Sequence, residues 1–176
     1  MSNQRFISTF AGTLDSKGRV CIPAAWRQIL AAQETAGVYL CPSLGGDTLH
    51  GFGQTLMDCE CKRLDELDPF LSGLHDDLAS QFVSGSVQLP IDENGRVRLP
   101  DDLIAAASLK DRVLFVGMGR RFEIWNPDAY APVKAARLAN ARAERMARVA
   151  QEIAARSAMQ AAATAPVTPA AEAGTP

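Results

Sequence analysis

The sequence predicts a small mixed α/β protein built from two related halves and a C-terminal helix, and three observations support this fold class. A ten-residue stretch, Leu14–Pro23, returns about 77 residues later as Ile91–Pro100, and such self-similarity indicates the architecture before any local pattern does. Each copy is followed by a short pattern of helical spacing. An Ala-rich segment with interspersed arginines comes after the second copy. Two copies are too few for a solenoid, so they predict a pseudo-two-fold module.

Each copy begins with the residues of a tight turn. The first copy places Asp15 three residues before Gly18, and the second places Asp92 three residues before Gly95. An Asp at the first position of a turn accepts a hydrogen bond from a backbone N–H two residues on, and Gly adopts a positive φ without steric cost. The chain is therefore expected to reverse direction at both places.

Each turn leads into a short strand with two different faces. Strand alternation predicts that four apolar side chains point into the core: Val20, Ile22, Val97 and Leu99. The basic side chains then lie on the opposite face or in the adjoining turn: Lys17, Arg19, Arg96 and Arg98. The second copy has Asn94 at the position of the lysine, and the first has Cys21 at the position of the last arginine. The two copies are therefore not expected to make identical contacts.

A proline ends each of these strands and is expected at the first position of a short helix, where its missing N–H is harmless. Apolar residues follow Pro23 and Pro100 at the spacing i, i+3, i+4, which predicts one buried stripe on each helix. These residues are Trp26, Ile29 and Leu30 in the first half and Leu103, Ala106 and Ala107 in the second. A further strand is expected after each helix, at 38–40 and at 113–116.

The remaining segments are less regular. β structure is expected at 5–14 and at 82–89, before the two turns. The acidic stretch between the halves predicts a loop from Cys41 with a short strand at 49–53. A loosely helical pattern follows at 55–67, and a second helix is expected around 69–78.

The predicted domain organisation has four parts. The first repeat with its helical linker occupies 5–80, and the second repeat occupies 81–128. An Ala- and Arg-rich helix is expected at 129–163, and its thin apolar content means that it needs a partner surface to hold it. The last part, 164–176, contains three prolines and is predicted to be disordered.

Composition and charge narrow the function classes. The chain has 176 residues, 47% of them hydrophobic and 22% charged, with a formal net charge of −2, which excludes a uniformly basic nucleic-acid binder. Charge is segregated, however, and the local field at a contact face can be basic on an acidic protein. No stretch approaches the 18 apolar residues of a membrane helix, and 1–10 lacks a signal-peptide core. We therefore expect a cytoplasmic protein whose four cysteines are free thiols: Cys21, Cys41, Cys59 and Cys61.

The repeated stretch resembles a known protein family. The run from Asp15 to Arg27 is similar to the first signature of the MraZ family, relatives of the AbrB/SpoVT transition-state regulators. The second copy resembles that family's second signature, and Val116–Trp125 resembles its closing strand pair. The match covers roughly 5–130 and is specific as a set, because a single Asp-x-x-Gly-Arg is a common hairpin turn.

The resemblance implies a fold, a partner and a function. The fold would be a pseudo-two-fold swapped-hairpin β-barrel (double-psi, AbrB-like) in which one chain supplies both halves, and the chains would assemble into a ring-shaped homo-oligomer. The partner would be double-stranded DNA, bound by Lys17, Arg19, Arg96 and Arg98. The function would be transcriptional repression from short promoter repeats of the cell-division and cell-wall gene cluster, including the protein's own gene, by a cytoplasmic, nucleoid-associated protein.

Simpler interpretations compete with several of these assignments. The basic residues could be solvated strand residues, and an Arg can bind either a phosphate or a guanine edge. Arg27 could be a structural or interface ion-pair partner or could touch DNA. The protein could also be a non-DNA oligomeric scaffold or an antitoxin-like interaction module.

An enzymatic or metal-dependent function is not expected, and no cofactor is predicted. The turn role of Asp15 and Asp92 accounts for both carboxyl groups. Cys59-x-Cys61 is too closely spaced for the usual zinc pair, which is Cys-x2–4-Cys, although Cys41 and two histidines lie near it in the sequence. The run Gly117–Gly119 lacks the third Gly and the following helix of a dinucleotide fingerprint, and a hairpin turn explains it.

Overall fold

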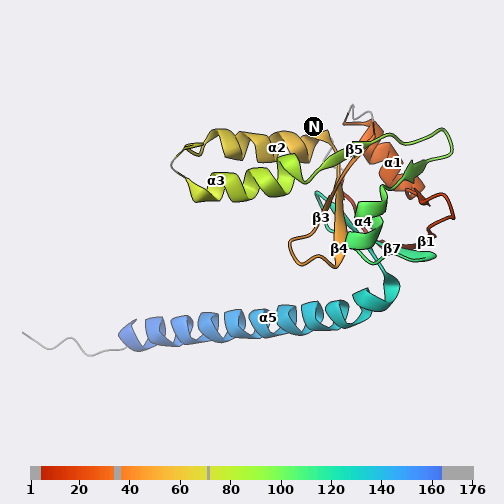
Figure 1. The fold of residues 1–176 in the computed structure, drawn as a ribbon. Coiled ribbons are helices and arrows are strands. Elements are labelled where there is room, and N and C mark those ends of the chain that lie inside the picture. Colours follow the sequence, from red (N-terminus) through yellow and green to blue (C-terminus); the bar gives the residue numbers. More distant parts are fainter. Residues whose placement is uncertain (1–4, 34–36, 71, 164–176) are drawn as a thin grey trace, which may run out of the picture. The chain divides into compact units, whose positions relative to one another are not determined.

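A computed structural model describes residues 5–33, 37–70 and 72–163 of the chain (Figure 1). The strands, in chain order, are β1 (Thr9–Thr13), β2 (Arg19–Cys21), β3 (Val38–Pro42), β4 (Thr48–Phe52), β5 (Val87–Leu89), β6 (Arg96–Arg98), β7 (Arg112–Gly117) and β8 (Phe122–Trp125). The helices are α1 (Ala24–Ala31), α2 (Gln54–Asp65), α3 (Gly73–Leu78), the π-helical η1 (Ala79–Ser84), α4 (Asp101–Ala106) and α5 (Pro127–Ala163). The fold class is therefore mixed α/β, as predicted.

Six strands form one antiparallel sheet in the order β1-β7-β8-β4-β3-β5, and β2 pairs with β6 in a separate two-stranded ribbon. Within the described residues β1 and β5 are the outer strands of the sheet and do not pair with each other. These hydrogen bonds therefore do not close into the predicted barrel.

The strands of the two halves interleave. Strand β1 of the first half pairs with β7 of the second, and β5 of the second half pairs with β3 of the first. The centre of the sheet, β4 against β8, again joins the two halves. A two-fold exchange of β1 with β5, β7 with β3 and β8 with β4 reproduces the strand order, so the sequence repeat is matched by a repeat in topology. Both repeats belong to one compact unit, 1–131.

The core of this unit is organised around Trp26 of α1. Its ring centroid lies 5.6 Å from that of Phe6, 5.0 Å from Phe122 and 6.1 Å from Phe115. The indole N–H donates a 3.1 Å hydrogen bond to the carbonyl of Ile7, so the polar end of the buried ring has a partner. The residues predicted to face inward from the repeated strands are all buried: Val20, Ile22, Val97 and Leu99.

Two local predictions need correction. Pro23 and Pro100 lie one position before α1 and α4, at the N-cap, rather than at the first helical residue. The β structure expected over 82–89 is confirmed only for its last three residues, because α3 continues into the helical turn η1. The reason is tertiary packing: Phe82 lies against the cluster of Cys41, Phe52 and Leu56, with its ring centroid 6.4 Å from that of Phe52.

The second compact unit, 132–176, contains most of α5. The helix predicted from Ala129 is present and continues through Pro132. Its larger apolar side chains are exposed, among them Leu138, Met146 and Ile153. None of the helices in the described part of the chain is long and apolar enough to span a membrane. The tail predicted to be disordered, 164–176, lies outside the described residues.

Candidate nucleic-acid interface

The ribbon of β2 and β6 gathers the basic residues of both repeats on one face. Its register places Arg19 opposite Arg98, Val20 opposite Val97, and Cys21 opposite Arg96. The two valines are fully buried, whereas Cys21 and Arg98 are exposed and the other two arginines are half-buried. Because side chains alternate between the faces of a strand, the three guanidinium groups share the outer face of the ribbon.

The first turn is held by the carboxylate of Asp15. One carboxylate oxygen accepts the backbone N–H groups of Lys17 and Arg19, both at 2.9 Å. The other oxygen accepts Nε of Arg19 at 2.8 Å and lies 2.7 Å from Nη2 of the same guanidinium. Gly18 has a φ of 71° and donates its N–H to the Asp15 carbonyl at 2.9 Å. The backbone of the turn and its arginine are therefore held by one side chain.

The second turn repeats this arrangement with Asp92. One carboxylate oxygen accepts the backbone N–H of Asn94 at 2.9 Å and that of Arg96 at 2.8 Å. The other accepts Nε of Arg96 at 3.2 Å. Gly95 has a φ of 78° and donates to the Asp92 carbonyl at 2.8 Å. The two turns thus share one hydrogen-bond pattern, with a longer carboxylate–guanidinium contact in the second.

These contacts shift the acidity of both carboxyl groups. The hydrogen bond from the Arg19 guanidinium, with the backbone N–H of the same residue, lowers the pKa of Asp15 to about 2. The backbone N–H of Arg96, helped by its guanidinium, lowers the pKa of Asp92 below its ordinary value. Hydrogen bonding to the charged form of a carboxyl group favours that form. Both turns therefore keep their negative charge across the physiological range.

The two turns are also tied to each other. The N–H of Ile22, just after β2, donates to the carbonyl of Gly95 at 2.9 Å, and the N–H of Leu99, just after β6, donates to the carbonyl of Gly18 at 2.8 Å. Each strand therefore ends on the glycine of the other repeat's turn. This reciprocal bracing limits how far the outer arginines can move apart, and such positioning is what a sequence-reading surface needs.

One residue of α1 and one of α4 each cover the turn of the opposite half. The sequence did not predict these two contacts. A Cβ placed on Gly95 would overlap the guanidinium of Arg27 in α1, and one on Gly18 would lie 3.3 Å from the Cδ1 of Ile104 in α4. The two covering residues stand at equivalent positions of the repeat. The constant offset of about 77 residues between the repeats therefore relates Arg27 to Ile104 and was the signal for their equivalent roles. No ion pair of Arg27 is found among the described residues, and its buried Nε has no hydrogen-bond partner there.

The arrangement can bind an anionic partner through side chains that are already oriented. An arginine has five N–H donors, and the contacts to Asp15 and Asp92 use only part of those of Arg19 and Arg96. The remaining donors, with exposed Lys17 and Arg98, can reach acceptors outside the protein. Guanidinium groups fork onto phosphate oxygens or onto the O6 and N7 atoms of guanine.

The cysteines lie apart from this face, except for Cys21. The Cys41 thiol is buried, and burial raises its pKa. Cys59 and Cys61 are half-buried in α2. No group of three or more His, Cys, Asp or Glu side chains that could hold a metal ion occurs in the described part of the chain.

The chain is similar to proteins of a known family. A family model described as "MraZ protein, putative antitoxin-like" matches residues 82–156. The chain is 43% identical over 127 residues to a protein of Parvibaculum lavamentivorans, which covers 72% of this chain and 78% of that protein. It is 39% identical over 140 residues to one of Gluconobacter oxydans, covering 78% and 85%. Both relatives are named transcriptional regulator MraZ. At this identity and coverage, with both repeated turns present, the chain belongs to the MraZ family.

Proposed function

We propose that this protein is a sequence-specific DNA-binding regulator that represses transcription. The observation that carries the proposal is the outer face of the β2–β6 ribbon, where one register brings together basic residues from two distant parts of the chain. Neither repeat alone provides such a face, because each contributes only one strand of the ribbon. The names of the relatives, transcriptional regulator MraZ, support the same function.

The basic residues have different roles in DNA binding. Arg19 and Arg96 carry the readout, because their carboxylate partners orient them. Lys17, which has no planar fork, contacts phosphate, and Arg98 extends the basic face. Contacts to phosphate position a protein on the duplex, whereas contacts to base edges specify the sequence.

We further propose how copies of the chain assemble and which DNA they bind. The interleaved halves follow a swapped-hairpin arrangement, and copies of the chain form a ring in which several basic faces meet one DNA. Linking weak contacts raises the effective concentration of each further contact. The target is a set of short, closely spaced repeats in the promoter of the cell-division and cell-wall gene cluster, which includes the protein's own gene. A protein acting on this DNA is cytoplasmic and nucleoid-associated.

Fluorescence anisotropy with a labelled fragment from upstream of the protein's own gene tests this function. We expect binding that weakens steeply with salt and that unlabelled fragment displaces but scrambled DNA of equal length does not. The double variant Arg19→Ala/Arg96→Ala should lose the preference for the specific fragment. Arg112→Ala, which removes an exposed arginine at the start of β7, is the matched control and should keep it. Equal displacement by both competitors would refute sequence-specific binding and favour a scaffold.

An antitoxin-like role is a second candidate, favoured by the family description and by exposed apolar residues on α5 such as Leu138 and Met146. In that case α5 would bind a partner protein. A chain ending at Ala131, the end of the first compact unit, should then lose co-purification with the product of a neighbouring gene. If DNA binding persists and no partner is lost, the second candidate fails.

A further inference from the structure

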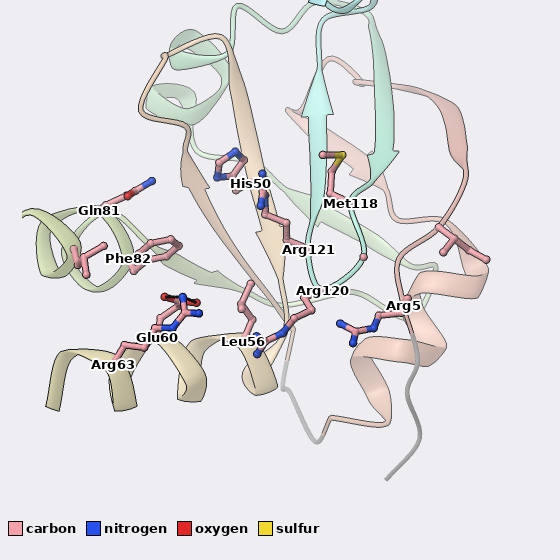
Figure 2. Close-up of a pocket in the computed structure, with 13 residues that line it drawn as sticks. Arg5, His50, Leu56, Glu60, Arg63, Gln81, Phe82, Met118, Arg120 and Arg121 are labelled. Carbon is pink, nitrogen blue, oxygen red and sulfur yellow. Dashed lines mark hydrogen bonds and ion pairs between the residues drawn. The ribbon is translucent and has the colours of Figure 1, made fainter. Parts of the chain in front are cut away.

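We infer that a pocket between the β7–β8 turn and α2 binds a small organic phosphate, specifically a phosphate monoester on an apolar body. The pocket has a volume of about 770 Å³, within the range of small-molecule sites. Its walls include the apolar side chains of Ile7, Leu56, Phe82 and Met118, and four arginines also line it: Arg5, Arg63, Arg120 and Arg121. Figure 2 shows these four arginines among the residues that line the pocket.

The backbone explains why the lining is divided into basic and apolar positions. Phe6 and Gly119 form an antiparallel bridge, with Phe6 N–H donating to the Gly119 carbonyl at 2.8 Å and the reverse bond at 3.0 Å. Phe6 is buried in the core, so the residues on either side of the bridge point to the other face. That register sets Arg5 beside the β7–β8 turn, which carries Arg120. It also sets Ile7 opposite Met118, and these two apolar side chains are exposed.

Two of the four arginines already have a carboxylate. Nη1 of Arg63 lies 3.1 Å from Oε1 of Glu60, whose carboxylate is nearly buried. Nη2 of Arg121 lies 3.4 Å from Oε1 of Glu123, whose carboxylate is fully buried. Glu60 is the only acidic residue among those that line the pocket. The pocket therefore has no further carboxylate with which to balance Arg5 and Arg120.

Arg5 and Arg120 are thus an uncompensated pair. Within the described residues neither has a hydrogen bond or ion pair, and both are exposed. Two positive charges that line the same pocket repel each other. In Figure 2 the side chain of Arg5 points toward Arg120. An anion between the two guanidinium groups would remove this repulsion.

The chemistry of the pocket selects the kind of anion. A phosphate monoester carries about −1.5 to −2 charges at neutral pH and three acceptor oxygens, which match two free guanidinium groups. Arginine forks fit such oxygens bidentately. The apolar wall formed by Leu56, Phe82 and Met118 would cover the organic part, so an ester should bind more tightly than inorganic phosphate. The inference does not depend on DNA binding, because none of the proposed DNA-contacting residues lines the pocket.

Isothermal titration calorimetry on the full-length chain without DNA tests the site, with phenyl phosphate, benzoate and inorganic phosphate as probes. We expect saturable binding of phenyl phosphate that is at least about tenfold tighter than that of inorganic phosphate, because the ring buries apolar surface. Benzoate, with one negative charge, should bind more weakly than the ester. Arg5→Gln and Arg120→Gln should each weaken phenyl phosphate binding about tenfold, the loss typical of a charged hydrogen bond.

The control is Arg112→Gln, which changes an exposed arginine at the other end of β7, paired with Asp128 at 3.8 Å. It should leave the affinity unchanged. An equal loss in the control, or equal affinity for phenyl phosphate and inorganic phosphate, would mean diffuse charge attraction and overturn the site. So would the absence of saturable heat. Tighter binding of benzoate than of phenyl phosphate would mean that the pocket prefers a carboxylate, and it would overturn the assignment of a phosphate ester.

Discussion

The two repeated turns have the same backbone and different charges. Asp15 and Asp92 hold their turns with the same hydrogen bonds, and Gly18 and Gly95 adopt nearly the same φ. The first turn, however, contains one acidic and two basic side chains (Asp15, Lys17, Arg19), whereas the second contains two acidic and one basic (Asp92, Glu93, Arg96). The two turns therefore share one backbone conformation but differ in net charge.

The interleaved fold partly corrects this imbalance. Arg27 of the first half lies over the second turn, whereas the equivalent residue over the first turn is the apolar Ile104. A positive charge from one repeat therefore compensates the acidic turn of the other. The contact surface therefore belongs to the pair of repeats, and the first turn is its more basic half.

The largest expected effect is on DNA affinity. Arg19→Ala should weaken specific binding at least about tenfold, the loss expected for one bidentate base contact, and Arg96→Ala should weaken it less because its turn is more acidic. Anisotropy titrations at fixed salt measure both. Because ion pairs at the protein surface contribute about 0–1 kcal/mol, thermal unfolding should change little in either variant. A large fall in melting temperature would show instead that these arginines are structural, and equal losses of affinity would contradict the asymmetry.

Replacing either glycine tests the scaffold. Gly18→Ala should lower the free energy of unfolding by about 1–2 kcal/mol, because an L-residue is strained at positive φ. Gly95→Ala should lower it further, because the added Cβ also overlaps the guanidinium of Arg27. Chemical denaturation measures this loss. Gly46→Ala is the matched control for strain alone, since Gly46 has a φ of 73° and nothing within 4 Å of the added Cβ.

The same glycines separate the two turns. In an Arg27→Ala background, Gly95→Ala should cost less than it does in the unaltered chain, because the overlap with the guanidinium is gone. Gly18→Ala should be independent of Arg27, since its neighbours are the Ile104 side chain and the Leu99 carbonyl. Additive effects for Gly95 and Arg27 in the double-mutant cycle would show that the contact between them is not energetically coupled.

Exchanging the residues at the tips of the turns should have a moderate effect. Asn94→Lys gives the second turn the lysine of the first, and Lys17→Asn does the reverse. If each lysine neutralises one phosphate, the slope of log affinity against log salt should steepen by about 0.9 in the first variant and flatten by about 0.9 in the second. Unchanged slopes in both variants would mean that the tips do not reach the DNA backbone.

The smallest effect concerns pH. The folded pKa of Asp15 is depressed to about 2, so its contribution to stability is complete above the unfolded value of about 3.9 and is lost as the pH falls through 2. The loss of stability in Asp15→Asn should therefore shrink between about pH 4 and pH 2. NMR titration of the carboxyl carbons should place Asp15 below Asp92, whose contact to its arginine is longer. The opposite order would contradict the difference in geometry.

Local sequence patterns predicted much of the fold. The Asp-x-x-Gly turns, the inward-facing valines Val20 and Val97, and the stripe containing Trp26 depend on residues close together in the chain, and the structure places them as expected. The segment around Phe82 was predicted wrongly because its alternation resembles a strand, while packing against Phe52 favours a helical turn.

What the sequence determined by itself was the pair of turns and the two-faced strands that follow them, because backbone conformation and alternation act over a few residues. Only the tertiary structure decided that β2 pairs with β6, that Arg27 covers Gly95, and that Arg5 and Arg120 line one pocket. Each of these contacts joins segments far apart in the chain, so no local pattern encodes it. The sequence therefore supplies the charged residues that would contact a ligand, but the fold decides which of them lie close together.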